Sequence, residues 1–341
     1  MTRRRALILS AVAVAGIASL GAGLASSVQA SNKAKRVRLA FFNPVAANAF
    51  TASTYSGIRY EAKLLNASVT SFDAGFDQNK QVTEMQDAIV SKKFDVFVVI
   101  PVNGAVLVQP TKQAIKAGIK VVATFNGIGP NLDSIKPQVP GMTSVIGQRL
   151  SINGTLLGQY IVRACGALNP CKVAYMPGSF KQGTEIIRLN ALNAVLGKYP
   201  HIQKIETAEG GYLAAPALKA ATDVLQAHPD INVFATSGDQ MMTGIIQAVK
   251  NAGLSGKMKL IGNGTTIEGV NWVRQGIVFA DPVALPYFDG TEGAKLAILA
   301  TRGQKVPSSI NELLFSPIGP VATKATLSTP KGRLFTGQYH G

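Results

Sequence analysis

Short apolar runs alternate with amphipathic segments along most of this chain, and this alternation restricts the possible folds more than any other feature. The runs at 36–42, 95–100 and 120–125 are rich in Val, Phe and Ile, and segments with apolar residues at helical spacing separate them. Continuous apolar strands separated by helices are typical of a parallel sheet that helices cover on both faces. The sequence therefore predicts an α/β protein.

The same alternation occurs a second time after residue 170. The apolar runs are 172–176, 231–236 and 258–262, and the amphipathic segments between them include 184–196, 215–227 and 239–252. Each strand-to-strand step spans about 30 residues, the size of one βαβ unit. The pattern predicts two similar doubly wound parallel-sheet lobes joined by a hinge, with the stretch 137–147 crossing between them.

The beginning of the sequence predicts export. Three arginines at 3–5 precede an uncharged apolar stretch, and small residues follow up to Ala30. This order is typical of a signal peptide, so residues 1–30 are predicted to be cleaved off and the protein to reach the periplasm. The alternative is a retained membrane anchor, which the Gly and Ser residues in the apolar stretch disfavour.

The remaining residues are enough for two lobes, each with its own core. Residues 31–140 and 282–305 are assigned to the N-terminal lobe. Residues 141–281 and 306–341 are assigned to the C-terminal lobe. In this division the chain passes between the lobes three times.

The charge of the chain raises the question of nucleic-acid binding. Lys and Arg number 34 against 18 Asp and Glu, for a formal net charge of +16. The basic residues are scattered, and the sequence has neither a basic stripe with interleaved aromatics nor a nucleic-acid-binding motif. We therefore expect no nucleic-acid partner.

The two cysteines, Cys165 and Cys171, have neither CxxC spacing nor a histidine at metal-ligand spacing. In an oxidising compartment a local disulfide between them is favoured, and two free buried thiols are the alternative. Both interpretations give the cysteines a structural role, and no metal site is expected.

Polar residues follow the predicted strands, at the edge where parallel sheets bind ligands. Asn pairs with hydroxyls as donor or acceptor, and a neighbouring aromatic face suits the apolar side of a sugar or polyol. Capping of the next helix is the alternative role, above all for Asp239, whereas no helix begins directly after Asn126. The candidate ligand-binding residues at these ends are Asn48, Asn103, Asn126, Asp239 and Asn263, with Phe50 and Phe125 beside them and Ser237 next to Asp239.

Some of these residues form motifs of a known family. The triplet Asn48-Ala49-Phe50 stands where that family has Asn-Pro-Phe, and Asn263-Gly264-Thr265 resembles its Asp-Gly-Thr signature. Over about residues 35–301 the chain resembles the type 1 periplasmic sugar-binding proteins, the ribose-binding class. The resemblance implies the type 1 periplasmic binding protein fold, with Phe50 stacked on a sugar. The resemblance also implies that Arg188 binds the ligand, because the corresponding second-lobe helix of the family carries a binding Arg.

The departures from this family replace charged groups with neutral ones. Asn126 and Asn263 stand where the family has Asp, and Gly238 stands where it has Asn. The resemblance implies a monomer that takes a small polar ligand, a sugar or sugar alcohol, into the cleft between the lobes. It further implies delivery to an ABC permease, with a chemoreceptor as a second possible partner. A linear polyol or a deoxy sugar is equally compatible with these substitutions.

A sensory binding protein for a non-sugar solute and a secreted α/β enzyme are the alternatives. The sequence after the first strand lacks Gly-x-Gly-x-x-Gly, and Gly-x-Ser-x-Gly is absent. His201, His228 and His340 fall in predicted loops or near the end of the sequence, where a nucleophile relay has no support. We therefore expect neither enzyme activity nor a cofactor.

Overall fold

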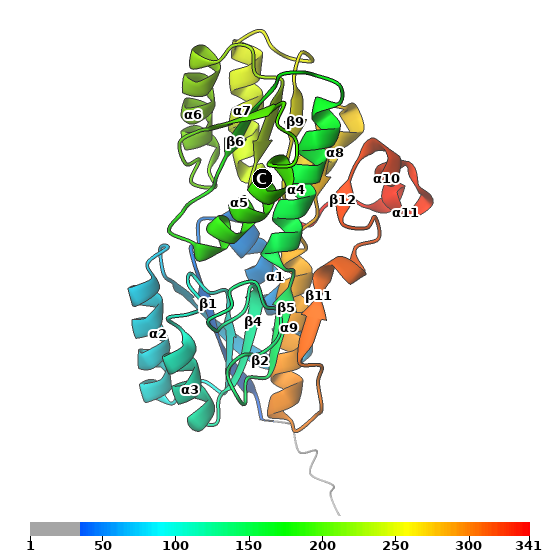
Figure 1. Ribbon diagram of the computed structural model, residues 1–341. Coiled ribbons are helices and arrows are strands. Elements are labelled where there is room, and N and C mark those ends of the chain that lie inside the picture. Colours follow the sequence, from blue (N-terminus) through cyan, green and yellow to red (C-terminus); the bar gives the residue numbers. More distant parts are fainter. Residues whose placement is uncertain (1–34) are drawn as a thin grey trace, which may run out of the picture. The chain divides into compact units, whose positions relative to one another are not determined.

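Two six-stranded sheets organise the residues that the computed structural model describes, 35–341 (Figure 1). Residues 36–341 form one unit, and the predicted signal peptide at 1–30 lies outside the described residues. Each sheet and its helices make one lobe, so the predicted α/β fold with two doubly wound lobes is confirmed. Within the described residues we find no helix with the length and hydrophobicity needed to cross a bilayer.

The first lobe is built on a fully parallel sheet of order β11-β5-β4-β3-β1-β2. Successive side chains of a strand point to opposite faces, and β1 therefore contributes Phe41 to one core and Phe42 to the other. Helices α1 and α9 cover the Phe41 face, whereas α2 and α3 cover the Phe42 face. The elements are β1 (Val37–Asn43), α1 (Ala49–Leu64), β2 (Ala67–Asp73), α2 (Gln78–Ser91), β3 (Val96–Val99), α3 (Val108–Lys116), β4 (Lys120–Phe125), β5 (Ser144–Gly147), α9 (Pro286–Thr301) and β11 (Ser309–Asn311).

The second lobe repeats this plan with the order β12-β10-β9-β8-β6-β7, in which only the edge strand β12 pairs antiparallel. Tyr175 of β6 packs under α4 and α5, and its neighbour Met176 packs under α6 and α7. The elements are α4 (Leu150–Cys165), β6 (Cys171–Met176), α5 (Gly183–Leu196), β7 (Ile202–Glu206), α6 (Ala214–Ala227), β8 (Val233–Thr236), α7 (Asp239–Asn251), β9 (Lys259–Ile261), α8 (Ile267–Gln275), β10 (Val278–Pro282), β12 (Val321–Ala322), α10 (Lys324–Ser328) and α11 (Pro330–Leu334). The short helix η1 (Glu312–Phe315) lies between the two lobes, after β11 and before β12.

The chain crosses between the lobes at 148–149, 283–285 and 312–320. The predicted division gave residues 141–281 and 306–341 to the second lobe, and this requires a correction. Strand β5 pairs with β4, and β11 pairs with β5, so both strands belong to the first sheet. Backbone pairing thus moves two of the crossings several residues later in the chain.

Helix α4 is an element that the sequence pattern does not predict. It contains Asn153, Gly154 and Gly158, which are weak helix formers. The glycines are needed because α4 lies close against α5: a Cβ at Gly154 would come within 2.1 Å of the Arg188 carbonyl oxygen. Tertiary packing overrides the local propensity here, and it places Asn153 next to Arg188.

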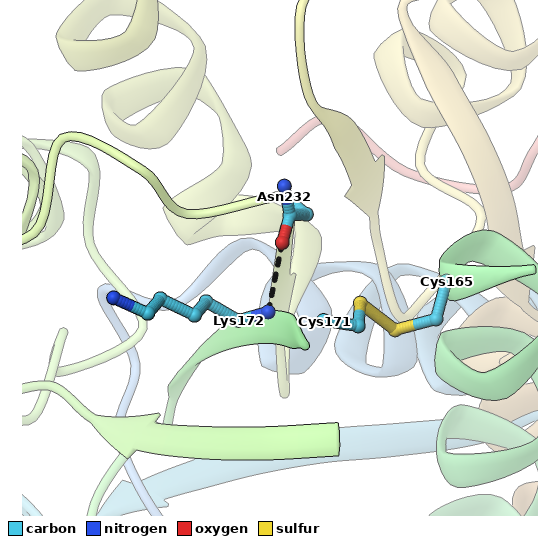
Figure 2. Close-up of a disulfide and its surroundings, with 4 residues drawn as sticks. All are labelled: Cys165, Cys171, Lys172 and Asn232. Carbon is cyan, nitrogen blue, oxygen red and sulfur yellow. Dashed lines mark hydrogen bonds between the residues drawn. A yellow bond between two sulfur atoms is a disulfide. The ribbon is translucent and has the colours of Figure 1, made fainter. Parts of the chain in front are cut away.

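A disulfide joins the end of α4 to the start of β6 (Figure 2). It links Cys165 and Cys171, and both cysteines are buried. Beside it, the Lys172 backbone N–H donates to Asn232 Oδ1 at 2.8 Å, which ties β6 to the turn before β8. The disulfide therefore lies at the amino end of β6, whereas the cleft described below lies at the carboxyl ends of the strands.

Candidate ligand-binding cleft

A cleft lies between the lobes at the carboxyl ends of the strands of both sheets. It holds about 670 Å³ of space free of protein atoms, open solvent included. Its first-lobe wall carries Pro44, Asn48, Phe50, Phe76 and Phe125. The second-lobe wall and the crossovers carry Gln148, Asn153, Gln182, Arg188, Tyr212, Ser237, Gln240, Asn263 and Ala284.

Aromatic rings form one face of this cleft. Phe50 meets Phe125 edge to face, with ring centroids 5.0 Å apart, and meets Tyr339 in the same way at 5.8 Å. Phe125 has a φ of 70°, an uncommon backbone conformation for a residue other than glycine. Strained residues of this kind cluster at ligand sites, where the surrounding fold holds them in place. The Phe50 ring is thus held between the rings of Phe125 and Tyr339.

Asn48 both caps a helix and lines the cleft. Its Oδ1 accepts hydrogen bonds from the backbone N–H groups of Phe50 and Thr51, at 2.9 and 3.4 Å, at the start of α1. The capping alternative is therefore correct for the oxygen of this amide. The Nδ2 group is what Asn48 can offer to a ligand.

Asn263 lines the cleft, but its amide is engaged within the protein. Its Nδ2 donates to Asn153 Oδ1 at 3.1 Å and to the Ser237 carbonyl at 2.9 Å, and its Oδ1 accepts from Asn153 Nδ2 at 2.9 Å. This pair of amides joins the end of β9 to α4. Asn153 is a site residue that the sequence did not reveal, because it lies on the helix that the pattern missed.

Arg188 lies in the cleft wall as an internally paired cation. Its Nη1 donates to Glu185 Oε2 at 2.9 Å and its Nε donates to Asn153 Oδ1 at 2.8 Å. Burial opposes the charged form, but the Glu185 carboxylate and then Tyr212 outweigh it and raise the pKa of Arg188 above its usual value. Arg188 therefore contributes a charged side chain to the wall of the cleft, and Glu185 balances that charge.

Two polar atoms in the lining lack a partner among the described residues. Ser237 Oγ and Gln148 Oε1 are buried and make no hydrogen bond. Buried polar groups are nearly always paired, so an unpaired one indicates a missing partner. The sequence pointed to Ser237 as a strand-end residue. It did not indicate Gln148, which follows β5 in the first crossover.

Three predicted ligand-binding residues do not line the cleft. Asn103 is used in a turn, where its Oδ1 accepts from the Ala105 N–H at 3.1 Å and its Nδ2 donates to Gln78 Oε1 at 2.9 Å. Asn126 is 2% exposed, lies directly after the lining residue Phe125, and has neither amide atom hydrogen-bonded. Asp239 is 0% exposed and lies beneath the cleft.

The Asp239 carboxylate organises the loop that carries Asn263. It accepts the backbone N–H groups of Asn263 at 2.8 Å and Thr266 at 2.9 Å. It also lies beside Asp281: burial, and then the charge of Asp239, raise the pKa of Asp281 well above its usual range. Its bonds to the backbone of this loop make Asp239 a positioning residue under the site.

A second buried carboxyl pair lies where the crossovers meet. The Glu312 carboxylate accepts from Gln148 Nε2 at 2.7 Å and from the Leu285 N–H at 2.9 Å, so one side chain of the third crossover holds the other two. Gln148 Nε2 also donates to the Val283 carbonyl at 2.9 Å. Burial and the neighbouring Glu312 raise the pKa of Asp289 well above its usual value. The crossovers are thus joined by buried side chains through hydrogen bonds.

The chemistry of the cleft is that of binding. Within residues 35–341 no group of three or more His, Cys, Asp or Glu side chains is arranged to hold a metal ion. None of the cleft-lining residues is Asp, Glu or His. The cleft therefore presents aromatic faces, amides, hydroxyls and one paired guanidinium to a ligand.

Two doubly wound lobes, three crossovers and a cleft at the hinge define a bilobal solute-binding protein. The family described as "Periplasmic binding protein domain" matches residues 39–305, and the chain belongs to this family. The expected resemblance is thereby confirmed. Membership implies a periplasmic location, and residues 306–341 lie beyond the matched range.

Proteins similar to this chain are binding proteins and not enzymes. The D-allose-binding periplasmic protein of Escherichia coli (strain K12) is 26% identical over 260 residues, which are 76% of this chain and 83% of that protein. A xylitol-binding protein of Mycolicibacterium smegmatis is 23% identical, over 87% of this chain and 82% of that protein. The structure of an ABC transporter solute binding protein from Agrobacterium vitis with bound D-fucose has a TM-score of 0.75 and 21% identity, and covers 87% of this chain and 98% of that one.

Proposed function

We propose that this chain is the solute-binding protein of an ABC importer and that it captures a small uncharged sugar or sugar alcohol between its lobes. The observation that carries the proposal is one cleft that combines a Phe50–Phe125 ring pair with buried, unpaired polar atoms on Ser237 and Gln148. A carbohydrate has an apolar CH face for the rings and hydroxyls for the polar atoms.

The electrostatics of the cleft favour an uncharged ligand. Its lining residues include no carboxylate, and the Arg188 guanidinium is paired with Glu185 at 2.9 Å. A cationic ligand would find no counter-ion, and an anionic one would have to compete with Glu185 for Arg188. The names of the similar proteins mention D-allose, xylitol and D-fucose, all of them neutral.

Within this class we favour a ligand with fewer hydroxyls, such as a deoxy sugar. The amides of Asn153 and Asn263 bond mainly to each other, which leaves few donors for a fully hydroxylated ring. Phe50 would stack on the ligand, and Asn48 Nδ2 and Ser237 Oγ would bond its hydroxyls. Asn126 is buried behind the cleft wall, and a rotation of its unpaired amide past Phe125 would be needed for it to meet the ligand.

The remaining roles follow from delivery to a transporter. The chain would be exported by a signal peptide cleaved after Ala30, act as a monomer and hand its ligand to an ABC permease. A chemoreceptor would read the same ligand-bound form, and the protein would catalyse no reaction. Sequencing the N-terminus of the mature protein from a periplasmic extract tests the cleavage site, which we expect near Ser31.

Calorimetric titration tests the ligand class. The panel contains D-allose, D-fucose, D-ribose and xylitol, with gluconate as an anionic and choline as a cationic control. We expect one neutral member to bind with micromolar affinity and, at 100 to 1,000 times its Kd, to stabilise the protein by about 3–4 kcal/mol. Preferential binding of a charged control, or binding of no neutral member, would contradict the proposal.

A further inference from the structure

Residues 336–341 pass between the two lobes and are hydrogen-bonded to both. From the first lobe, Ser53 Oγ of α1 donates to the Gln338 carbonyl at 3.2 Å. From the second lobe, the N–H of Ile267, at the start of α8, donates to the Tyr339 carbonyl at 2.7 Å. The segment therefore occupies a place at the hinge that the matched family range, 39–305, does not include.

The residues after Tyr339 attach the segment to α8. The Glu268 carboxylate contacts His340 Nδ1 at 2.7 Å and accepts the N–H of Gly341 at 2.9 Å. On the other side, the N–H of Phe288 in α9 donates to Gln338 Oε1 at 3.2 Å. Contacts on both sides of Tyr339 thus fix its backbone, and with it the direction of its side chain.

The Tyr339 ring is part of the cleft wall. It is 5% exposed, lies among the cleft-lining residues, and meets Phe50 edge to face at 86° and 5.8 Å. Its hydroxyl lies against Gly264, where a Cβ would come within 2.3 Å of Tyr339 Oη. Gly264 has a φ of 143°, so its lack of a side chain both permits that backbone conformation and leaves room for the tyrosine.

We propose that Tyr339 is a ligand-contacting residue that limits the size of the ligand this cleft accepts. The proposal rests on the proposed function, because it names a further residue of the same site. The ring supports Phe50, the residue expected to stack on a sugar, and it closes the cleft on the side of the hinge. A shorter side chain at this position would leave a space about the size of a phenol ring beside the ligand.

Calorimetric titration of four proteins with xylitol, D-fucose, D-allose and the disaccharide maltose tests this role. The proteins are the wild type, Tyr339→Ala, Tyr339→Phe and the control Tyr199→Ala. Tyr199 contacts His201 in the second lobe, is 37% exposed and does not line the cleft. Tyr339→Ala should weaken the tightest monosaccharide or alditol at least tenfold and reduce the preference over maltose. Tyr339→Phe keeps the ring and should retain the preference over maltose, whereas Tyr199→Ala should bind like the wild type.

A variant that loosens the segment but keeps the ring separates contact from general support. Glu268→Ala removes the bonds to His340 and Gly341 and should weaken binding less than Tyr339→Ala, with the preference over maltose retained. Far-UV circular dichroism checks the fold of each variant. If Tyr339→Ala does not fold, Tyr339→Trp replaces it and should weaken binding of D-allose more than binding of xylitol.

The outcomes distinguish this inference from the proposed function. A wild type that binds sugars and a folded Tyr339→Ala protein with unchanged affinities and unchanged preference would overturn the inference alone. An effect of Glu268→Ala equal to that of Tyr339→Ala would also overturn it, because the ring would then act only through the placement of the segment. A wild type that binds no member of the panel would overturn both.

Discussion

Replacing Arg188 with methionine should destabilise the folded protein by about 3 kcal/mol, because it leaves the buried Glu185 carboxylate without its cation. The Arg188 and Glu185 side chains are 5% and 0% exposed, and their Nη1–Oε2 distance is 2.9 Å. Removing one partner of such a pair typically costs about 3–5 kcal/mol. The lower end of this range applies because Glu185 keeps three donors. These are Tyr175 Oη at 3.1 Å, the Gly178 N–H at 3.3 Å and Tyr212 Oη at 2.5 Å.

Two further variants, Glu185→Gln and the double variant Arg188→Met/Glu185→Gln, test whether this loss of stability arises from the ion pair. Glu185→Gln leaves the Arg188 charge buried without its carboxylate, although Arg188 Nε still donates to Asn153 Oδ1, and it should also cost about 3 kcal/mol. The double variant buries neither charge. Its cost should not exceed that of either single variant, which corresponds to a coupling free energy of about 3 kcal/mol.

Equilibrium unfolding in urea, followed by far-UV circular dichroism, measures the three free energies. The fluorescence of Trp272, the sole tryptophan of the chain, reports on the second lobe in parallel. Lys219→Met serves as the control, since its partner Asp223 is 59% exposed and the pair should contribute little. If the costs of the two single variants simply add in the double variant, the pair is not coupled and the reasoning is wrong.

Three further predictions concern the disulfide, the hinge and the cleft. The double variant Cys165→Ala/Cys171→Ala should lose about 2 kcal/mol of unfolding free energy in urea, because a short loop is no longer closed, and an unchanged midpoint would contradict this. The raised pKa of Asp289 means that its contribution to stability is present at acidic pH and is lost as pH rises through that pKa. Asp289→Asn should therefore raise the melting temperature more at pH 8 than at pH 5, whereas a difference independent of pH would refute the assignment. Ser237→Ala should weaken sugar binding about fivefold or more without lowering the melting temperature, since the hydroxyl has no protein partner, and unchanged calorimetric affinity would show that it does not meet the ligand.

The periodicity of the sequence was sufficient to predict the class of fold. A strand buried on both faces must be apolar at every position, and β1 with its successive Phe41 and Phe42 meets this requirement. Helix α4 was not predicted because Gly154 and Gly158 weaken the helical pattern in the sequence. These glycines are explained by a close approach to α5, which is a fact about another part of the chain.

The candidate site was predictable only as a set of strand ends. Position after a strand brought Asn48, Phe50 and Asn263 to the cleft, as expected for parallel sheets. The same rule could not tell that the Asn103 amide is used in a turn or that Asp239 lies beneath the cleft. A short polar side chain after a strand can bond to its own loop, to a neighbouring loop or to a ligand, and local sequence does not distinguish these partners.

The sequence by itself determined the two lobes and the aromatic and amide character of the strand ends, and it predicts the export signal. Tertiary structure alone decided which of those groups remain unpaired and which distant segments complete the cleft. Gln148 enters from a crossover, and Tyr339 enters through a segment whose residue Gln338 is bonded to Ser53 across 285 positions of sequence. Periodicity reports which face of an element is buried, because burial repeats with the geometry of that element. Contacts between remote segments have no such repeat, so only the folded chain specifies them.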